Sequence, residues 1–363
     1  MGAVFAKIYS APDGVNALKN FFRFAVKDIV SFDYSPKFIS GSSFSLEFPA
    51  NKTLVGAIRN NDLIEVDGNW FSVETVAYNH SVMTISGVDL KGLLERRISA
   101  AGNDPDLYDS FEGTTAEVIE HFVYRNIGLG ADEIRRMPVS FDANGVTGLI
   151  NDGYMAKLEY LSDIVKTLCY TAGIGFEIVG DPDAAKLKMR LLQGIDRSML
   201  QSVRPRVILS PGWGNVQDQS FEHDISNLYN AITAKKPDGT LRVVNRDGVA
   251  AAGLSRRECV VDVGSNDNDD ADKMALEAVE DNVETHTYKA IPISDSYGVD
   301  FRLGDIVTVR DPFTGNSFNA PVTEAHISCS SGEKSVEIGV GGLKPKFLNR
   351  IINNLIAGTQ KRR

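Results

Sequence analysis

The chain has 363 residues, of which 43% are hydrophobic and 24% charged, and its formal net charge at pH 7 is −10. This composition excludes collagen-like and intrinsically disordered chains, and the length suffices for two or three domains. The acidic balance disfavours general nucleic-acid binding, because contacts to phosphates need clustered Lys and Arg.

The N-terminus and the cysteines indicate a protein made in a reducing cytosol. No apolar stretch follows a basic start, and no run approaches 18 apolar residues, so we expect neither a signal peptide nor a membrane segment. The three cysteines, Cys169, Cys259 and Cys329, are far apart, which argues against a structural zinc site. Cys169 falls on an apolar helix face and is expected to be a core residue.

Residues 1–101 are predicted to form a first β domain. Segment 43–48 alternates between apolar and polar residues, as a half-buried strand does. Segment 63–76 predicts a β-hairpin, because two β-prone runs flank an Asp-Gly turn. At 87–101 the apolar residues change to a helical period, which predicts a helix after the last strand.

Residues 102–202 are predicted to form an α+β insert domain. Thr114 and Glu117 have the spacing of a capping box, which predicts a helix that runs to about residue 127. A second helix is expected at about 158–171, followed by strands at 175–179 and 186–192.

Residues 203–343 are predicted to form a second β domain. Its expected strands lie at 207–209, 215–221, 230–234, 241–244, 290–293, 306–309, 322–329 and 335–340. One helix is expected at about 269–288, because its start is acidic, as the helix dipole prefers.

The last segment, 344–363, is predicted to be an amphipathic helix with a basic tail. Its apolar residues recur at intervals of three and four, which leaves a stripe that needs a partner. Packing on its own domain and packing on another subunit are both open. In the second case the subunit contact would include Leu348, Ile351, Ile352 and Leu355.

No enzyme motif is present in the sequence. It lacks the P-loop, HExxH and GxSxG patterns, and the five histidines show no metal-binding spacing. The acidic run 266–272 lacks the Gly and Glu positions of an EF-hand and fits a helix N-terminus better. We therefore expect no catalytic, cofactor-binding or metal-binding residues and no enzymatic activity.

Two short motifs are expected to shape the backbone. Gly87 and Asp89 mark a change from strand to helix, with Asp89 near the helix N-terminus. Gly304 can adopt a φ that other residues avoid, and Asp305 is expected to accept hydrogen bonds from nearby backbone amides.

Four segments resemble the tail-tip baseplate hub family of siphophages, which is similar to the myophage baseplate hub. Segment 84–98 resembles its strand-to-helix junction, and segment 220–234 the start of its second barrel. Segment 297–309 is similar to its Tyr-x-x-Asp-aromatic-x-Leu-Gly-Asp-x-Val strand, which includes Asp300, and segment 323–341 to its closing hairpin.

The resemblance implies an α+β fold that is mainly β, with two β-barrel domains like those of the tail tube. It implies a structural virion protein that forms a homotrimer, whose six barrels make a pseudo-hexameric ring matching the hexameric tube. The hub would sit at the phage tail tip after synthesis in the host cytoplasm.

The implied partners are the distal tail protein and tail tube above, and tip or receptor-binding proteins below. The tape measure protein and the DNA in transit would occupy the lumen during genome ejection, without specific nucleic-acid binding. An acidic lumen would repel the DNA and let it slide. Larger relatives continue into lysin or receptor-binding domains, and we expect those tasks to fall to other proteins here.

Two other functions stay open from the sequence. A phage cell-wall hydrolase or peptidase would need a deep pocket with paired carboxylates of perturbed pKa. A carbohydrate-binding or receptor-binding β module would present an exposed aromatic platform.

Overall fold

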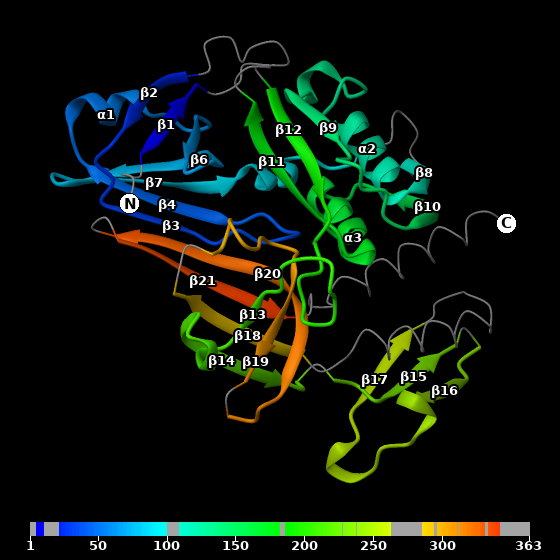
Figure 1. The fold of residues 1–363 in the computed structure, drawn as a ribbon. Helices are drawn as coiled ribbons and strands as arrows, with labels where there is room; N and C mark the ends of the chain where they lie inside the picture. The colour runs from blue at the N-terminus through cyan, green and yellow to red at the C-terminus, as the bar shows by residue number, and fades with distance from the viewer. Residues whose placement is uncertain are drawn as a thin grey trace. The chain divides into compact units, whose positions relative to one another are not determined.

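The computed structural model describes residues 5–10, 22–99, 109–181, 186–226, 228–236, 238–262, 285–293, 296–311, 313–330 and 333–341. The chain divides into two compact units (Figure 1). The first comprises Met1–Ser220 and Lys289–Val340, and the second Phe221–Tyr288 and Gly341–Arg363. The predicted boundaries at residues 101, 202 and 343 stay a prediction.

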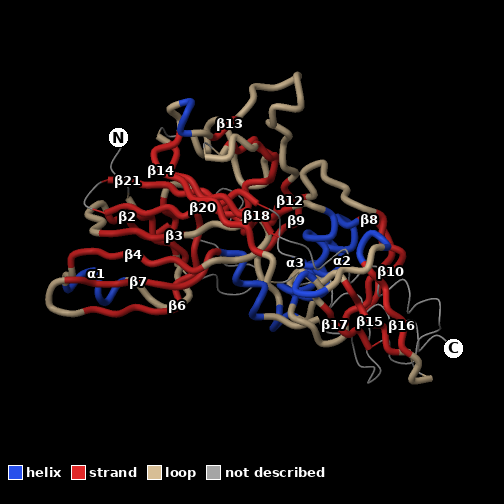
Figure 2. Tube along the Cα trace, turned by 90° about the horizontal axis from the view of Figure 1, so that it is seen from below, coloured by secondary structure: helices blue, strands red, loops and turns tan. Residues whose placement is uncertain are grey.

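The first strand set of the first unit is antiparallel, in the order β3-β4-β7-β6-β5-β1-β2. Its strands run side by side in Figure 1 and Figure 2. The strands are β1 (Ala6–Tyr9), β2 (Phe22–Val26), β3 (Ser31–Tyr34), β4 (Ser43–Pro49), β5 (Leu63–Val66), β6 (Asn69–Tyr78) and β7 (Val82–Asp89). A short helix, α1 (Lys52–Ala57), connects β4 to β5.

The second strand set joins the first through one antiparallel pair, β20 with β3, from Ile327 opposite Tyr34 to Ser330 opposite Ser31. Its strands are β13 (Ile208–Leu209), β14 (Val216–Asp224), β18 (Thr285–Pro292), β19 (Ile306–Arg310), β20 (Ser317–Ser330) and β21 (Glu333–Gly341). The fold is α+β and mainly β, as predicted. The two closed barrels are not confirmed, because the described strands of the two sets form one open 13-stranded sheet, in which β13 and β19 lie off the main path.

Alternation along the strands builds the core of the first strand set. In β4, Phe44, Leu46 and Phe48 are buried while the residues between them are not, as predicted. The β5–β6 hairpin is also confirmed. Its two turn residues, Asp67 and Gly68, have φ values of 52° and 80°, the positive pair that a two-residue hairpin requires.

Residues 109–192 of the first unit, called the insert below, contain both helices and strands. Helix α2 (Thr115–Asn126) starts at the predicted capping box of Thr114 and Glu117. Helix α3 (Leu161–Ala172) buries Cys169, as predicted, and burial raises the pKa of this thiol. The strands β9 (Val139–Asp142), β11 (Gly175–Asp181) and β12 (Lys186–Leu192) form one sheet, and β8 (Asp109–Thr114) and β10 (Ile150–Ala156) form another.

The second unit contains a three-stranded sheet. Its central strand is β15 (Ala231–Lys235), which pairs antiparallel with β16 (Leu241–Asn245) and parallel with β17 (Glu258–Asp262). Strand β17 was not predicted. Among the described residues of the chain, no helix has both the length and the apolar character needed to span a membrane.

Two predicted helices need correction. The helix at 87–101 is wrong in its start and type, since β7 stays paired with β6 through Asp89 and a 3-10 helix, η1 (Leu90–Arg96), follows. Of the helix at 269–288, the last four residues instead begin β18, where Tyr288 and Ala290 are buried around exposed Lys289. Residues 269–284 and the predicted C-terminal helix lie outside the described residues.

Gly87 provides a test of the pairing between β6 and β7. A Cβ at this position would overlap the Ser72 carbonyl oxygen and lie 2.9 Å from the Glu74 nitrogen, beside the irregularity in the β6 register. We expect Gly87→Ala to lower the free energy of unfolding by about 2 kcal/mol or more, measured by urea denaturation.

The matched control for this variant is Gly56→Ala. Gly56 lies in α1, and no atom comes within 4 Å of the Cβ that alanine would add. Alanine should gain up to about 1 kcal/mol there through its helix propensity. Equal effects of the two variants would contradict the packing argument.

Candidate functional site

Three parts of the first unit meet at Phe38, in the loop between β3 and β4. Its ring is 3% exposed, and a Cβ at either Gly175 or Gly304 would overlap it. The Phe176 amide donates a 3.3 Å hydrogen bond to the Phe38 carbonyl, and the Phe38 amide donates a 2.9 Å bond to the Thr323 carbonyl. This loop therefore joins β11 of the insert to the second strand set.

Asp305 ties the chain after β12 to the turn before β19. Its buried carboxylate accepts hydrogen bonds from the Ile195 amide at 2.8 Å, the Arg197 Nε at 2.8 Å and the Arg302 amide at 3.1 Å. The preceding Gly304 has a φ of 88°, in the region that favours glycine. The turn geometry thus directs the carboxylate at donors more than 100 residues earlier in the chain.

Asp89 caps η1 from the end of β7. Its carboxylate is buried, accepts a 3.3 Å hydrogen bond from the Gly92 amide and accepts a 3.2 Å bond from the Tyr34 hydroxyl. Burial raises the pKa of Asp89, while Lys91 and these hydrogen bonds oppose that shift. Burial, followed by the charge of Asp89, also raises the pKa of Tyr34.

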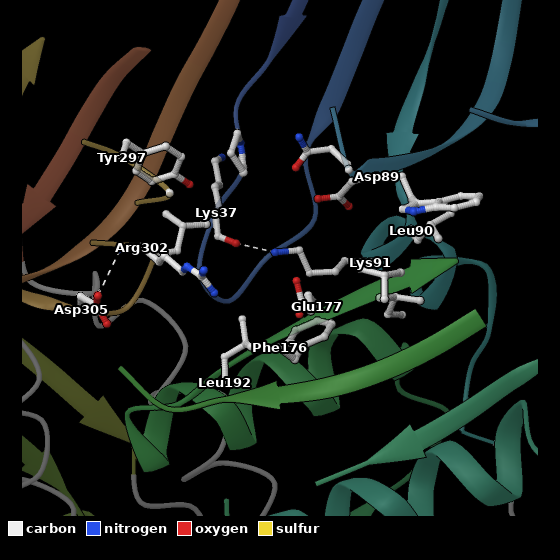
Figure 3. A pocket seen from close by; sticks show the side chains of 18 of the residues that line it. Lys37, Asp89, Leu90, Lys91, Phe176, Glu177, Leu192, Tyr297, Arg302 and Asp305 are labelled. Carbon is white, nitrogen blue, oxygen red and sulfur yellow. Dashed lines mark hydrogen bonds between the residues drawn. The ribbon is translucent and has the colours of Figure 1, made fainter. Parts of the chain in front are cut away.

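Lys91 is a buried amine in η1. The residue is 7% exposed, and its amine donates a hydrogen bond to the Lys37 carbonyl. The Nζ atom lies 5.5 Å from the centre of the Phe176 ring. Burial lowers its pKa, and the charges of Asp89 and Glu177 oppose the shift. Figure 3 shows the amine between those two carboxylates. Lys91 thereby connects η1, the β3–β4 loop and β11.

These groups surround a cavity of about 470 Å³ (Figure 3). Its wall combines residues from the β3–β4 loop, η1, β11, the chain after β12 and the turn before β19. They include Tyr34, Lys37, Asp89, Lys91, Phe176, Glu177, Arg197, Tyr297, Arg302 and Asp305. Within the described part of the chain, no group of three or more His, Cys, Asp or Glu side chains is placed to hold a metal ion.

Of the predicted motif residues, three lie at this junction and two lie elsewhere. Asp89 and Asp305 line the cavity, and Gly304 packs against the ring of Phe38. Gly87 packs against β6, and Asp300 is exposed in a turn. The predicted subunit contacts Leu348, Ile351, Ile352 and Leu355 lie outside the described residues.

Sequence reasoning missed both Phe38 and Lys91. Phe38 gave no signal, since its neighbours Gly175 and Gly304 are distant in the chain. Lys91 did give a signal in the sequence, because it lies in an apolar run with Leu90 and Leu93, where a charged side chain is unusual.

A family model described as Siphovirus ReqiPepy6 Gp37-like protein matches residues 21–342. No curated protein matches the chain.

Solved structures of tail proteins match nearly the whole chain. The 43 kDa tail protein of prophage MuSo2 from Shewanella oneidensis has a TM-score of 0.60 at 12% identity, covering 96% of this chain and 98% of its own. The tail protein from Neisseria meningitidis MC58 has a TM-score of 0.57 at 14% identity, and the match covers 95% of this chain and 98% of that protein. Prophage tail protein gp18 from Listeria monocytogenes EGD-e has a TM-score of 0.53 at 13% identity, and the match covers 98% of each chain. The fold is therefore that of these tail proteins, and the resemblance to phage tail proteins is confirmed.

Replacing Asp89 and Lys91 should reveal their coupling. Asp89→Asn leaves a buried ammonium with less compensation, and Lys91→Met removes the positive charge and the donor to the Lys37 carbonyl. We expect each change to cost about 2 kcal/mol in the free energy of unfolding. The double variant should lose about 1 kcal/mol less than the sum, as measured by urea denaturation. Strict additivity would contradict the coupling.

Asp305→Asn should destabilise the first unit more than Asp300→Asn. An amide nitrogen would face donors of Arg197 or Arg302, and the ion pair to Arg197 would be lost. We expect a cost of about 2–4 kcal/mol for Asp305→Asn, and no more than about 0.5 kcal/mol at exposed Asp300. Thermal and urea unfolding of the two variants would check this, and similar losses would contradict the role given to Asp305.

Proposed function

Because the chain belongs to the Siphovirus ReqiPepy6 Gp37-like protein family, we propose that it is a structural virion protein, the hub at the distal end of the phage tail tube. The observation that carries the proposal is that the chain matches solved tail proteins over 95% or more of its length. The tightly packed junction at Phe38 supports it, since a hub must hold its parts in fixed positions.

The hub would be a homotrimer in which each chain supplies two tube-like β domains, giving a pseudo-hexameric ring. The two strand sets, joined only by the β3–β20 pair among the described strands, support this arrangement. Strand β2 is the last strand in the order of this sheet, and an edge strand with free backbone groups can pair with another chain. Residues 203–343 would form the second of these β domains, and residues 102–202 would form an α+β insert domain between the two.

The ring would dock the distal tail protein and tail tube on one side and tip or receptor-binding proteins on the other. The tape measure protein and the DNA would pass through its lumen during genome ejection. The net charge of −10 supports passage without specific binding, because like charges repel the phosphates. Leu348, Ile351, Ile352 and Leu355 would contribute to a subunit contact.

Oligomeric mass tests the proposal directly. We expect light scattering on the purified protein to give about 119 kDa, three times the 39.6 kDa of one chain, and negative-stain images to show a ring with a central bore. If only a monomer is found, the same measurement is repeated with the distal tail protein added. A monomer that neither trimerises nor binds this protein would overturn the hub.

A further inference from the structure

Three donor groups at the cavity have no role in holding the junction together. Among the described residues, the side chains of Lys37 and Arg302 and the hydroxyl of Tyr297 have no hydrogen-bond or ion-pair partner, although all three residues line the cavity. Figure 3 shows Arg302 and Tyr297 on the same side as Lys37. Arg302 is exposed, which places it at the mouth of the cavity.

The carboxylates of the same wall are already compensated. Asp305 pairs with Arg197 at 2.8 Å and accepts two backbone amides. Glu177 pairs with Arg190 at 2.5 Å. Asp89 accepts the two hydrogen bonds described above and lies near the amine of Lys91. The uncompensated charge at the cavity is therefore positive, in a chain whose net charge is negative.

We propose that this cavity binds a ligand through its carboxylate group, with the Arg302 guanidinium as the anchor and Lys37 and the Tyr297 hydroxyl as further donors. A guanidinium offers two parallel N–H groups that match a carboxylate. The body of the ligand would lie against the aromatic walls of Trp70 and Phe176.

Binding would tighten the junction. The donors come from the β3–β4 loop and the turn before β19, and the aromatic walls come from β6 and β11. A ligand that contacts all of them is bound by the folded unit and not by the unfolded chain, so it raises the stability of the fold by mass action. The carboxylate can come from a free small molecule or from an acidic side chain of another polypeptide.

Isothermal titration calorimetry of the full chain tests the site with two probes. Succinate represents a free dicarboxylate, and N-acetyl-glutamate N-methylamide represents an acidic side chain of a polypeptide. We expect saturable binding of at least one, and the tighter probe identifies the source. Arg302→Gln should weaken that binding about tenfold or more, since a charge-assisted bond is lost. Tyr297→Phe should weaken it several-fold without any change in charge.

The matched control is Arg59→Gln. Arg59 is exposed, lies in the same unit and does not line the cavity, so this variant carries the same change in charge. Its affinity should equal that of the unchanged protein, and circular dichroism should show all variants folded. Absence of saturable binding by both probes would overturn the proposal. Three other results would also overturn it. Arg59→Gln could weaken binding as much as Arg302→Gln does, chloride at matched ionic strength could give equal heats, or inorganic phosphate could bind more tightly than both probes.

Discussion

The ring of Phe38 can lie where it does only because two glycines leave space for it. Gly175 comes from the insert and Gly304 from the second strand set, and a side chain on either would overlap the ring. Backbone hydrogen bonds from Phe176 and to Thr323 hold the same loop on both sides. The positions of β11 and of the turn before β19 thus depend on one close approach, since a packed interior leaves no room for adjustment.

The buried charged groups Lys91 and Asp89 add hydrogen bonds to the junction at a cost in desolvation energy. Burying Lys91 and Asp89 costs desolvation energy that their mutual attraction offsets only in part, as the opposed influences on their pKa values indicate. Each nevertheless makes directional bonds that an apolar side chain lacks. Lys91 donates a hydrogen bond to the carbonyl of Lys37, and Asp89 accepts one from the Tyr34 hydroxyl. Such bonds depend on direction, which apolar packing does not.

This arrangement suits a protein that works by assembly. The match to tail proteins covers 95 to 98% of the chain at only 12 to 14% identity, so the fold persists while most side chains differ. The hub function proposed here rests on that fold and on the family. The cavity adds a separate possibility of binding, because its unpaired donors are not needed for the junction.

The sequence by itself determined the local elements. The β5–β6 hairpin follows from Asp67 and Gly68, and the start of α2 from Thr114 and Glu117, since each depends on residues within a few positions. The mainly β character and the resemblance to tail proteins also came from short segments. Only the tertiary structure decided that β7 continues to Asp89, that one open sheet joins the two strand sets, and that Phe38 meets Gly175 and Gly304. These features arise from contacts between residues far apart in the chain, and no local pattern encodes such contacts.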